Sequence, residues 1–206
     1  MVEEKESRVS RYSFWEEGGN FLTHALACAL IVWSLVLSDN HLYHLLSFSV
    51  ALTFFFSTLY HGAGLLNLKR SIVDRFRRMD VLSIYVTIMM TGITWGMAAN
   101  TSPYIIMGIL VPMVSIFYWA SKHYGTYEFE DRHTALTVVS SLMTAAIFYL
   151  GDWSTAQLIY FTGGLALYAT GTVVYVMRDR EWAHTIWHCF SSLAAALHLY
   201  GLNSIS

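Results

Sequence analysis

Long uncharged segments constrain the fold of this chain more than any other feature. No Asp, Glu, Lys or Arg occurs in residues 18–38, 40–68 or 81–121. Residues 133–177 contain a single charged side chain, Asp152, and residues 182–206 contain none. The hydrocarbon core of a bilayer is about 30 Å thick, and an α-helix of about 20 apolar residues crosses it. Each segment is therefore long enough for at least one transmembrane helix.

Two of these segments are long enough for two helices. Residues 81–121 contain the turn-forming sequence Asn100–Pro103 near their middle, and residues 133–177 contain Gly151–Thr155. The other three segments supply one helix each. We therefore predict a single all-α membrane domain over residues 1–206, a seven-transmembrane helix bundle with residues 1–17 as a short N-terminal segment.

Basic residues predict the orientation of this bundle. All 12 Lys and Arg side chains precede the first predicted helix or lie in the connections 2–3, 4–5 and 6–7. The other three connections and the C-terminal tail contain none. Because Lys and Arg concentrate in short cytoplasmic loops, we expect the N-terminus in the cytoplasm and the C-terminus outside. This is the pattern of a multi-pass protein of the cell membrane, plasma or inner.

Composition and charge placement exclude several classes of protein. The chain is 55% hydrophobic and only 13% charged, which is unlike a water-soluble domain. A net charge of −2 offers no basic face for nucleic acid. A G-protein-coupled receptor would have the opposite orientation, and a retinal protein needs a lysine inside a span. Cys28 and Cys189 lie in apolar segments and do not indicate a disulfide.

Five polar residues fall near the cytoplasmic ends of three predicted helices. Ser57 and His61 are four residues apart near the end of the second helix, and Asp80 begins the third. His184 and His188 are four residues apart at the start of the seventh. Ionisable side chains are costly inside a membrane, so a cluster of them at one depth indicates a functional site.

The spacing of the histidines favours a metal site. Residues at i and i+4 lie on one helix face about 6 Å apart, so His184 and His188 can hold one ion, and His61 completes a set of three nitrogens. A catalytic zinc keeps its fourth position open for water, whose pKa falls to about 7. Asp80 is then the candidate general base, and Ser57 a hydrogen-bond donor to the water or to a developing oxyanion.

A structural interpretation stays open beside the metal site. Each histidine alone can be a buried side chain that hydrogen-bonds a carbonyl or Asp80, and Ser57 can bond back to its own helix. A bis-histidine haem is a further alternative, although an Asp and a Ser at the same depth suit a hydrated zinc better.

Other polar residues are predicted to surround the site or to lie apart from it. The first helix carries residues that we interpret as packing and supporting groups: Glu17, Asn20, Thr23 and His24. As a fourth ligand, His24 would close the zinc site. His198 lies ten residues beyond His188, about 15 Å deeper, and cannot share the ion. The remaining histidines, His41, His44, His123 and His133, are expected near loops and in contact with solvent.

These motifs resemble the progestin and adipoQ receptor family, in particular its bacterial hemolysin III branch. Glu17–His24 is similar to the family's E-x-x-N-x-x-T-H opening, Ser57–His61 to its S-x-x-x-H, and His184–His188 to its H-x-x-x-H. The resemblance covers nearly the whole chain. It implies seven helices, a cytoplasmic N-terminus, Zn²⁺ held by three histidines, and kinship to membrane hydrolases that include alkaline ceramidases.

Two functions follow as hypotheses. The first is a zinc-dependent membrane hydrolase that cleaves a lipid amide or ester and is linked to membrane lipid homeostasis, with its substrate entering from the inner leaflet. The second is a non-enzymatic regulator of membrane properties, a receptor or a cytolysin, in which zinc is structural. In both cases the expected partner is a membrane lipid.

Overall fold

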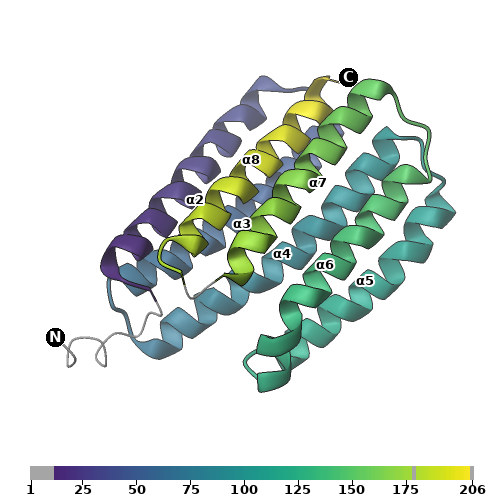
Figure 1. The fold of residues 1–206 in the computed structure, drawn as a ribbon. Helices are drawn as coiled ribbons and strands as arrows, with labels where there is room; N and C mark the ends of the chain where they lie inside the picture. The colour runs from purple at the N-terminus through teal and green to yellow at the C-terminus, as the bar shows by residue number, and fades with distance from the viewer. Residues whose placement is uncertain (1–11, 178–179, 205–206) are drawn as a thin grey trace.

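Long helices make up nearly all of the described chain. The computed structural model describes residues 12–177 and 180–204 (Figure 1). Its elements are α2 (Phe14–Ser34), the short 3-10 turn η1 (Leu35–Leu37), α3 (His41–Leu65), α4 (Arg70–Ala98), α5 (Pro103–His123), α6 (Tyr127–Tyr149), α7 (Thr155–Val176) and α8 (Ala183–Ser204). The all-helical fold is thus confirmed, and the predicted turns near Asp39, Asn100 and Asp152 lie between helices.

Side-chain caps account for several helix starts. Ser13 and Glu16 form a capping box at α2, and Ser154 and Gln157 form another at α7. In such a box each residue satisfies a backbone N–H that the helix itself leaves free. The side chain of Asn40 accepts from two N–H groups at the start of α3. These caps matter because a helix end inside or beside a bilayer has little water to bond its free N–H groups.

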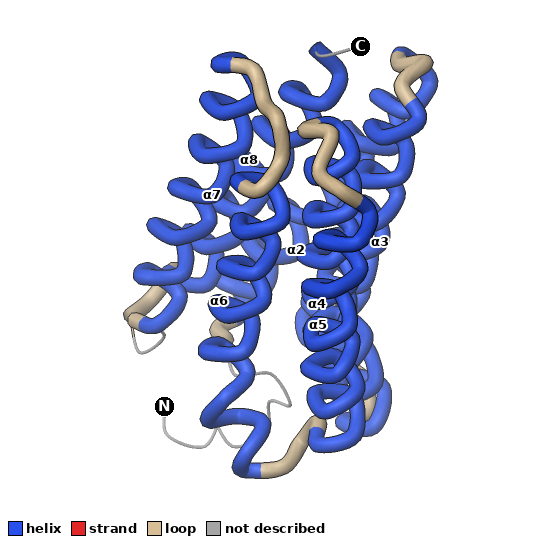
Figure 2. The backbone as a smooth tube through the Cα atoms, turned by 90° about the vertical axis from the view of Figure 1, so that its right-hand side faces the viewer, coloured by secondary structure: helices blue, strands red, loops and turns tan. Residues whose placement is uncertain are grey.

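The helices pack side by side as a bundle, as Figure 2 shows from a second direction. The most extensive contacts join α7 to α8, α3 to α4 and α2 to α3, while α8 also contacts both α2 and α3. The main buried cluster draws on every long helix except α5. Trp95 of α4, Phe148 of α6 and Phe161 of α7 pack together in it, with Phe148 and Phe161 stacked at 4.0 Å.

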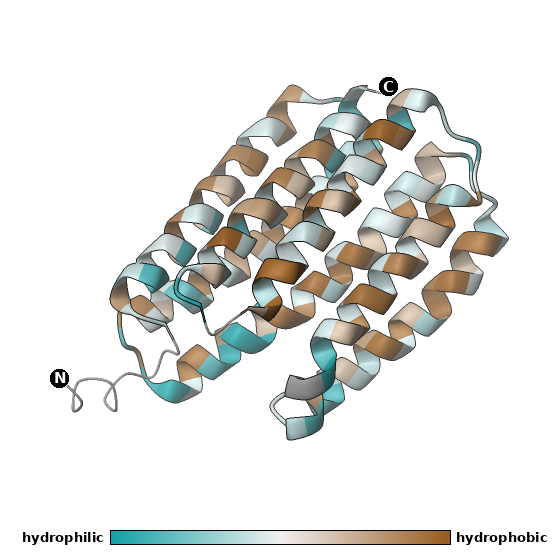
Figure 3. Cartoon of the chain, in the orientation of Figure 1, coloured by the Kyte–Doolittle hydropathy of each residue, from teal (hydrophilic) through white to brown (hydrophobic). Residues whose placement is uncertain are grey.

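The outer surface of the bundle is apolar, as expected for contact with lipid. On α2, the exposed side chains include Leu22, Leu26 and Leu30, whereas the buried ones include Asn20 and His24. This distribution is the reverse of that on a helix at the surface of a soluble protein. Figure 3 shows hydrophobic residues along the helices and a hydrophilic stretch at the start of α4.

Five helices of the described chain are long and apolar enough to cross a membrane: α2 with η1, α3, α4, α5 and α7. The sequence predicted seven crossings. The two remaining long helices, α6 and α8, fall short of the apolar composition expected for a span. On α8, polar side chains lower the hydropathy, and three of them, His188, Ser191 and His198, are buried. On α6, the charged residues lie in the first two turns.

Two helices begin earlier than the uncharged segments indicated. Asp80 was expected to begin its helix, but α4 starts ten residues before it, at Arg70. Charged side chains are compatible with a helix outside the hydrocarbon region, and Val73 of this extension packs against Tyr60 of α3. Similarly, α6 starts at Tyr127.

This extension of α6 corrects the expected environment of His133. That side chain was expected to lie beside a loop in contact with solvent. It is instead buried within α6, where its ring stacks on Phe129 at 5.3 Å and its Nε2 lies 3.3 Å from the hydroxyl of Tyr175.

Candidate metal centre

Three histidines from two helices meet at one point in the bundle. His61 lies near the end of α3, and His184 and His188 lie in the first two turns of α8. One nitrogen of each ring lies within 4.8 Å of the corresponding nitrogen of the other two rings. The structure therefore brings together the three residues that the sequence predicted as metal ligands.

Helix geometry explains the pair on α8. Residues at i and i+4 share a helix face, and the rings of His184 and His188 lie with their centroids 4.5 Å apart and their Nε2 atoms 3.0 Å apart. His61 reaches this pair because α3 and α8 are in direct contact. Its ring centroid is 4.9 Å from that of His188 and 5.2 Å from that of His184.

The hydrogen bond of His61 leaves one of its nitrogens available for a metal. Its Nδ1 lies 2.6 Å from Oε2 of Glu17, and both side chains are almost completely buried. A carboxylate in this position holds the proton on Nδ1 and leaves the lone pair on Nε2. Within the described part of the chain, that buried Nε2 atom has no hydrogen-bond partner. An unpaired buried nitrogen directed at two other imidazoles fits a metal ion.

The hydrogen bonds of His188 lead to the same result. Its Nδ1 lies 3.3 Å from the carbonyl oxygen of Asn20 and 3.3 Å from the hydroxyl of Thr23, both on α2. A proton on Nδ1 would be donated to the Asn20 carbonyl, so Nε2 faces His184 as an acceptor. The Asn20 side chain in turn accepts a 2.6 Å hydrogen bond from Thr185 of α8. The supporting role predicted for the polar face of the first helix therefore matches these contacts.

His24 lies beside the three histidines without joining them. Its ring stacks on that of His188, with centroids 3.7 Å apart and planes 5° from parallel, and on its other side it packs against Phe54. A metal lies in the plane of the imidazole that binds it, about 2 Å from the nitrogen. Because the two rings are stacked and nearly parallel, an ion in the plane of the His188 ring would lie well outside the plane of the His24 ring. This geometry does not suit His24 as a fourth ligand.

Ser57 and Asp80 form a pair one helical turn from the triad. Ser57 precedes His61 by four residues on α3, so the two residues share a face of that helix. Its buried side chain hydrogen-bonds the Asp80 carboxylate of α4, and the charge of Arg77 acts on the same carboxylate. Asp80 is not one of the residues whose ligand atoms meet within 4.8 Å.

His198 lies apart from this group, as the sequence predicted. Its Nε2 lies 3.0 Å from the carbonyl oxygen of Phe161, and its ring stacks on the Phe161 ring in the aromatic cluster. This histidine therefore links α8 to α7, and its ring nitrogens are not part of the group formed by the three others.

Two residues at the edge of the site were not found from the sequence. The ring of Tyr12 stacks on His184 at 4.7 Å, with planes 16° apart. Glu16 accepts a 3.0 Å hydrogen bond from the backbone N–H of Trp182, which ties the start of α2 to the start of α8. Neither contact has a sequence pattern that would have revealed it, since both depend on how α2 and α8 approach each other.

Comparison with known proteins identifies the family of the chain. A family model described as "Haemolysin-III related" matches residues 12–199, a range that includes the three histidines of the triad and the supporting residues described above. A comparison with curated protein sequences gives no match. The matched region also contains the five apolar helices, as expected for a multi-pass membrane protein. The chain therefore belongs to the haemolysin-III related family, the group that includes the progestin and adipoQ receptors.

Proposed function

We propose that this protein is a zinc-dependent membrane hydrolase that cleaves an amide or ester bond in a lipid. The observation that carries the proposal is the set of three imidazole nitrogens within 4.8 Å of one another. The hydrogen bonds from His61 to Glu17 and from His188 to Asn20 support it. Supporting bonds of this kind orient metal-binding histidines and fix their tautomers.

Three nitrogen ligands favour zinc over the alternatives. Mg²⁺ and Ca²⁺ prefer oxygen ligands, whereas three histidines with an open fourth position are typical of catalytic zinc. When bound to His61, His184 and His188, zinc would polarise a carbonyl group and make a water molecule more acidic. Glu17 and Asn20 would keep the imidazoles directed at the ion.

Asp80 and Ser57 are the proposed catalytic side chains. A carboxylate within the bundle can take a proton from water and return it to a leaving amine or alcohol, which is general base and acid catalysis. The hydroxyl of Ser57, which hydrogen-bonds Asp80, can orient that carboxylate or donate to a developing oxyanion. Ser57 lies one helical turn before His61 on α3 and holds Asp80 of α4, which sets the pair next to the triad.

We further propose that all seven long helices cross the membrane, with the N-terminus in the cytoplasm. The five apolar helices and the placement of all 12 basic residues on one side support this topology. The triad would then lie near the inner leaflet, and a lipid substrate would enter from that leaflet.

An isotope experiment tests the hydrolase directly. The purified protein, loaded with zinc and reconstituted into lipid nanodiscs with a lipid extract, is incubated in H₂¹⁸O. Hydrolysis of an amide or ester places ¹⁸O in the released carboxylic acid, which mass spectrometry detects. We expect labelled fatty acid with the wild-type protein and none with Asp80→Asn at the same zinc content. Absence of labelled acid with the zinc-loaded wild-type protein would contradict the proposal.

A second candidate is a non-enzymatic regulator of membrane properties in which the metal is structural. The position of the triad favours it, because His61 is fully buried and Tyr12 stacks on His184 at the edge of the site. A metal there would hold α3 and α8 together. Asp80→Ala separates the two functions: a regulator with structural zinc keeps its effect on membrane properties, and a hydrolase loses it.

A further inference from the structure

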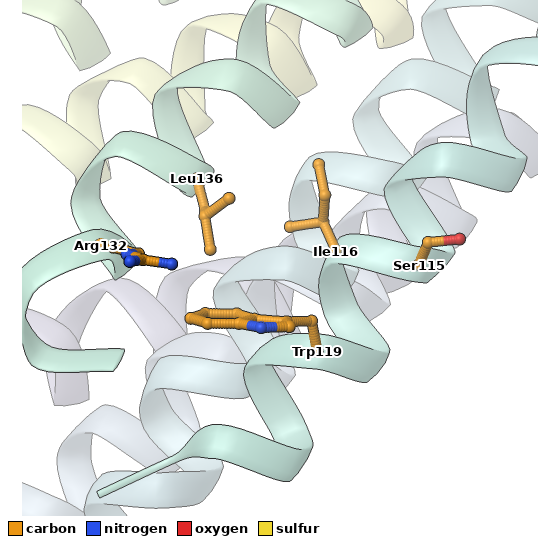
Figure 4. Close-up of a pocket in the computed structure, with 5 residues that line it drawn as sticks. All are labelled: Ser115, Ile116, Trp119, Arg132 and Leu136. Carbon is orange, nitrogen blue, oxygen red and sulfur yellow. The ribbon is translucent and has the colours of Figure 1, made fainter. Parts of the chain in front are cut away.

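A cleft between α5 and α6 lies outside the candidate metal centre. It has a volume of about 360 Å³ and is lined by Ser115, Ile116, Trp119, Arg132 and Leu136. Figure 4 shows Arg132 and Leu136 of α6 facing Ile116 and Trp119 of α5. Neither α5 nor α6 contributes a residue to the triad, and both lie at the edge of the bundle away from α2 (Figure 1).

Among the described residues that line the cleft, Arg132 alone is charged, and it lies at one end; the Ser115 hydroxyl bonds the carbonyl of Val111 on its own helix, and the other lining side chains are largely apolar. Trp119 lies near the end of α5 and Arg132 near the start of α6, so both are close to the connection between the two helices. Ile116 lies about one turn deeper on α5, and Leu136 about one turn deeper on α6. A positive charge at the end of the bundle is thus followed by apolar walls that run toward its interior.

The walls of the cleft are held in place by the core beneath them. Ile116, Trp119 and Leu136 pack against the buried cluster formed by Tyr85, Ala120 and Phe129. The ring of Trp119 also stacks on His123, with centroids 4.8 Å apart and planes 18° from parallel. A preformed cleft binds its ligand with little loss of side-chain freedom, which favours affinity.

Arg132 has the charge and the freedom to bind an anion. Its side chain is exposed, and no carboxylate among the described side chains forms an ion pair with it. A guanidinium matches the geometry of a phosphate because it donates two parallel hydrogen bonds. Basic pockets between transmembrane helices at the cytoplasmic side are suited to anionic lipid headgroups.

We propose that this cleft binds one anionic phospholipid, with its phosphate on Arg132 and an acyl chain along Ile116 and Leu136. The charge at one end and the apolar walls at the other match the two parts of such a lipid. A purely apolar occupant, such as a helix of another protein, would leave the Arg132 charge without a partner. This lipid is a structural ligand at the edge of the bundle and is distinct from the substrate of the proposed hydrolase.

Native mass spectrometry of the full chain in detergent tests this proposal. The protein is titrated with phosphatidylglycerol or phosphatidylcholine of the same acyl composition, and the fraction carrying one lipid is measured. Both lipids offer a phosphodiester to Arg132, but the choline of phosphatidylcholine brings a positive charge close to the guanidinium. We expect the wild type to bind phosphatidylglycerol about tenfold more tightly because it lacks this repulsion between like charges. Arg132→Gln is expected to abolish that preference. Lys122→Gln removes a basic residue at the same end that does not line the cleft, and it should keep the preference.

Two further variants complete the test. Leu136→Trp fills the apolar part and keeps the charge, so it should lose the bound lipid even if Arg132→Gln fails to fold. His184→Ala should keep the lipid, because the cleft does not depend on the metal centre. Equal binding of the two lipids by the wild type would overturn the proposal. An unchanged preference in Arg132→Gln, or an equal loss in Lys122→Gln, would also overturn it.

Discussion

An imidazole has two nitrogens, and the partner of one decides what the other can do. In this protein Glu17 binds Nδ1 of His61, and the carbonyl of Asn20 lies near Nδ1 of His188. The Nε2 atoms of both rings are thereby left as acceptors that converge with His184. The residues on α2 thus orient the histidines of a candidate metal site whose proposed ligands all come from other helices.

Glu17 is predicted to raise the affinity for the metal without touching it. In Glu17→Gln the carboxylate becomes a neutral amide, which polarises the His61 ring less. Loss of a supporting group of this kind lowers metal affinity about 10- to 100-fold, which competition with a zinc chelator can measure. Glu128→Gln, at an exposed site on α6, is the matched control and should leave the affinity unchanged. Equal affinities in both variants would show that Glu17 does not support the site.

His24 is predicted to be dispensable for metal binding. His24→Phe keeps an aromatic ring between His188 and Phe54 and removes both ring nitrogens. Because the stacked geometry does not suit His24 as a ligand, the zinc content of the purified variant should equal that of the wild type. A variant that is purified in folded form but lacks zinc would show that His24 binds the ion.

The sequence predicted the convergence of the three histidines better than it predicted their surroundings. The i, i+4 spacing of His184 and His188 fixes their common face within one helix, so local geometry was sufficient. The pairing of His61 with Glu17 depends on the contact between α2 and α3, which no spacing within one helix can predict. Tyr12 could not be found, since its position on His184 depends on the path of the chain before α2.

At the scale of helices, small residues allow α7 and α8 to pack closely. Three glycines of α7, Gly163, Gly164 and Gly171, lie where a Cβ atom would come within 2.8 Å of a side chain of α8. A Cβ atom at Gly164 would lie 2.1 Å from Nε2 of His198, and one at Gly171 would lie 2.8 Å from Phe190 and Trp187. Small residues at interfaces are a common means of close approach between membrane helices.

Gly164→Ala is therefore predicted to destabilise the protein. The added methyl group would displace the ring of His198, and overpacking of this kind costs about 1–3 kcal/mol. Thermal unfolding in detergent should show a lower Tm. Gly108→Ala on α5 is the control, since a Cβ there meets nothing within 4 Å, and it should be neutral or slightly stabilising. An unchanged Tm in Gly164→Ala would contradict the close contact.

Helix ends show why the uncharged segments predicted seven long helices but not where those helices begin and end. Uncharged segments indicate where a chain can be in hydrocarbon, whereas a helix continues for as long as its backbone hydrogen bonds and its packing allow. The extension of α4 back to Arg70 is held by Val73 against Tyr60. Such contacts involve residues distant in sequence, so no local pattern could reveal them.

At the scale of the whole molecule, the bundle carries its polar residues inside and its apolar residues outside. On α2 this arrangement places Glu17, Asn20 and His24 toward α3 and α8, and leucines toward the surface. The fold therefore encloses the triad between helices at one end of the bundle, the end that also carries the basic residues at and beside the described connections α3–α4 and α5–α6. Placement of the site and orientation in the membrane are linked for this reason.

The proposed orientation predicts which positions a reagent can reach from outside the cell. In a variant without Cys28 and Cys189, single cysteines are introduced as Ser71→Cys or Asp152→Cys, both at exposed positions. A membrane-impermeant maleimide should label position 152 in intact cells and position 71 only after the membrane is opened. The reverse pattern would contradict the cytoplasmic N-terminus, and labelling of both positions from outside would contradict the number of crossings between them.

The most direct test of the account is the metal content of the purified protein. Inductively coupled plasma mass spectrometry on the wild type and on His184→Ala, purified side by side without chelators, measures the zinc bound per chain. The account predicts one zinc ion per wild-type chain and its loss in the variant. A wild-type protein that binds no zinc when zinc is supplied, or a variant that keeps it, would contradict a metal held by His61, His184 and His188.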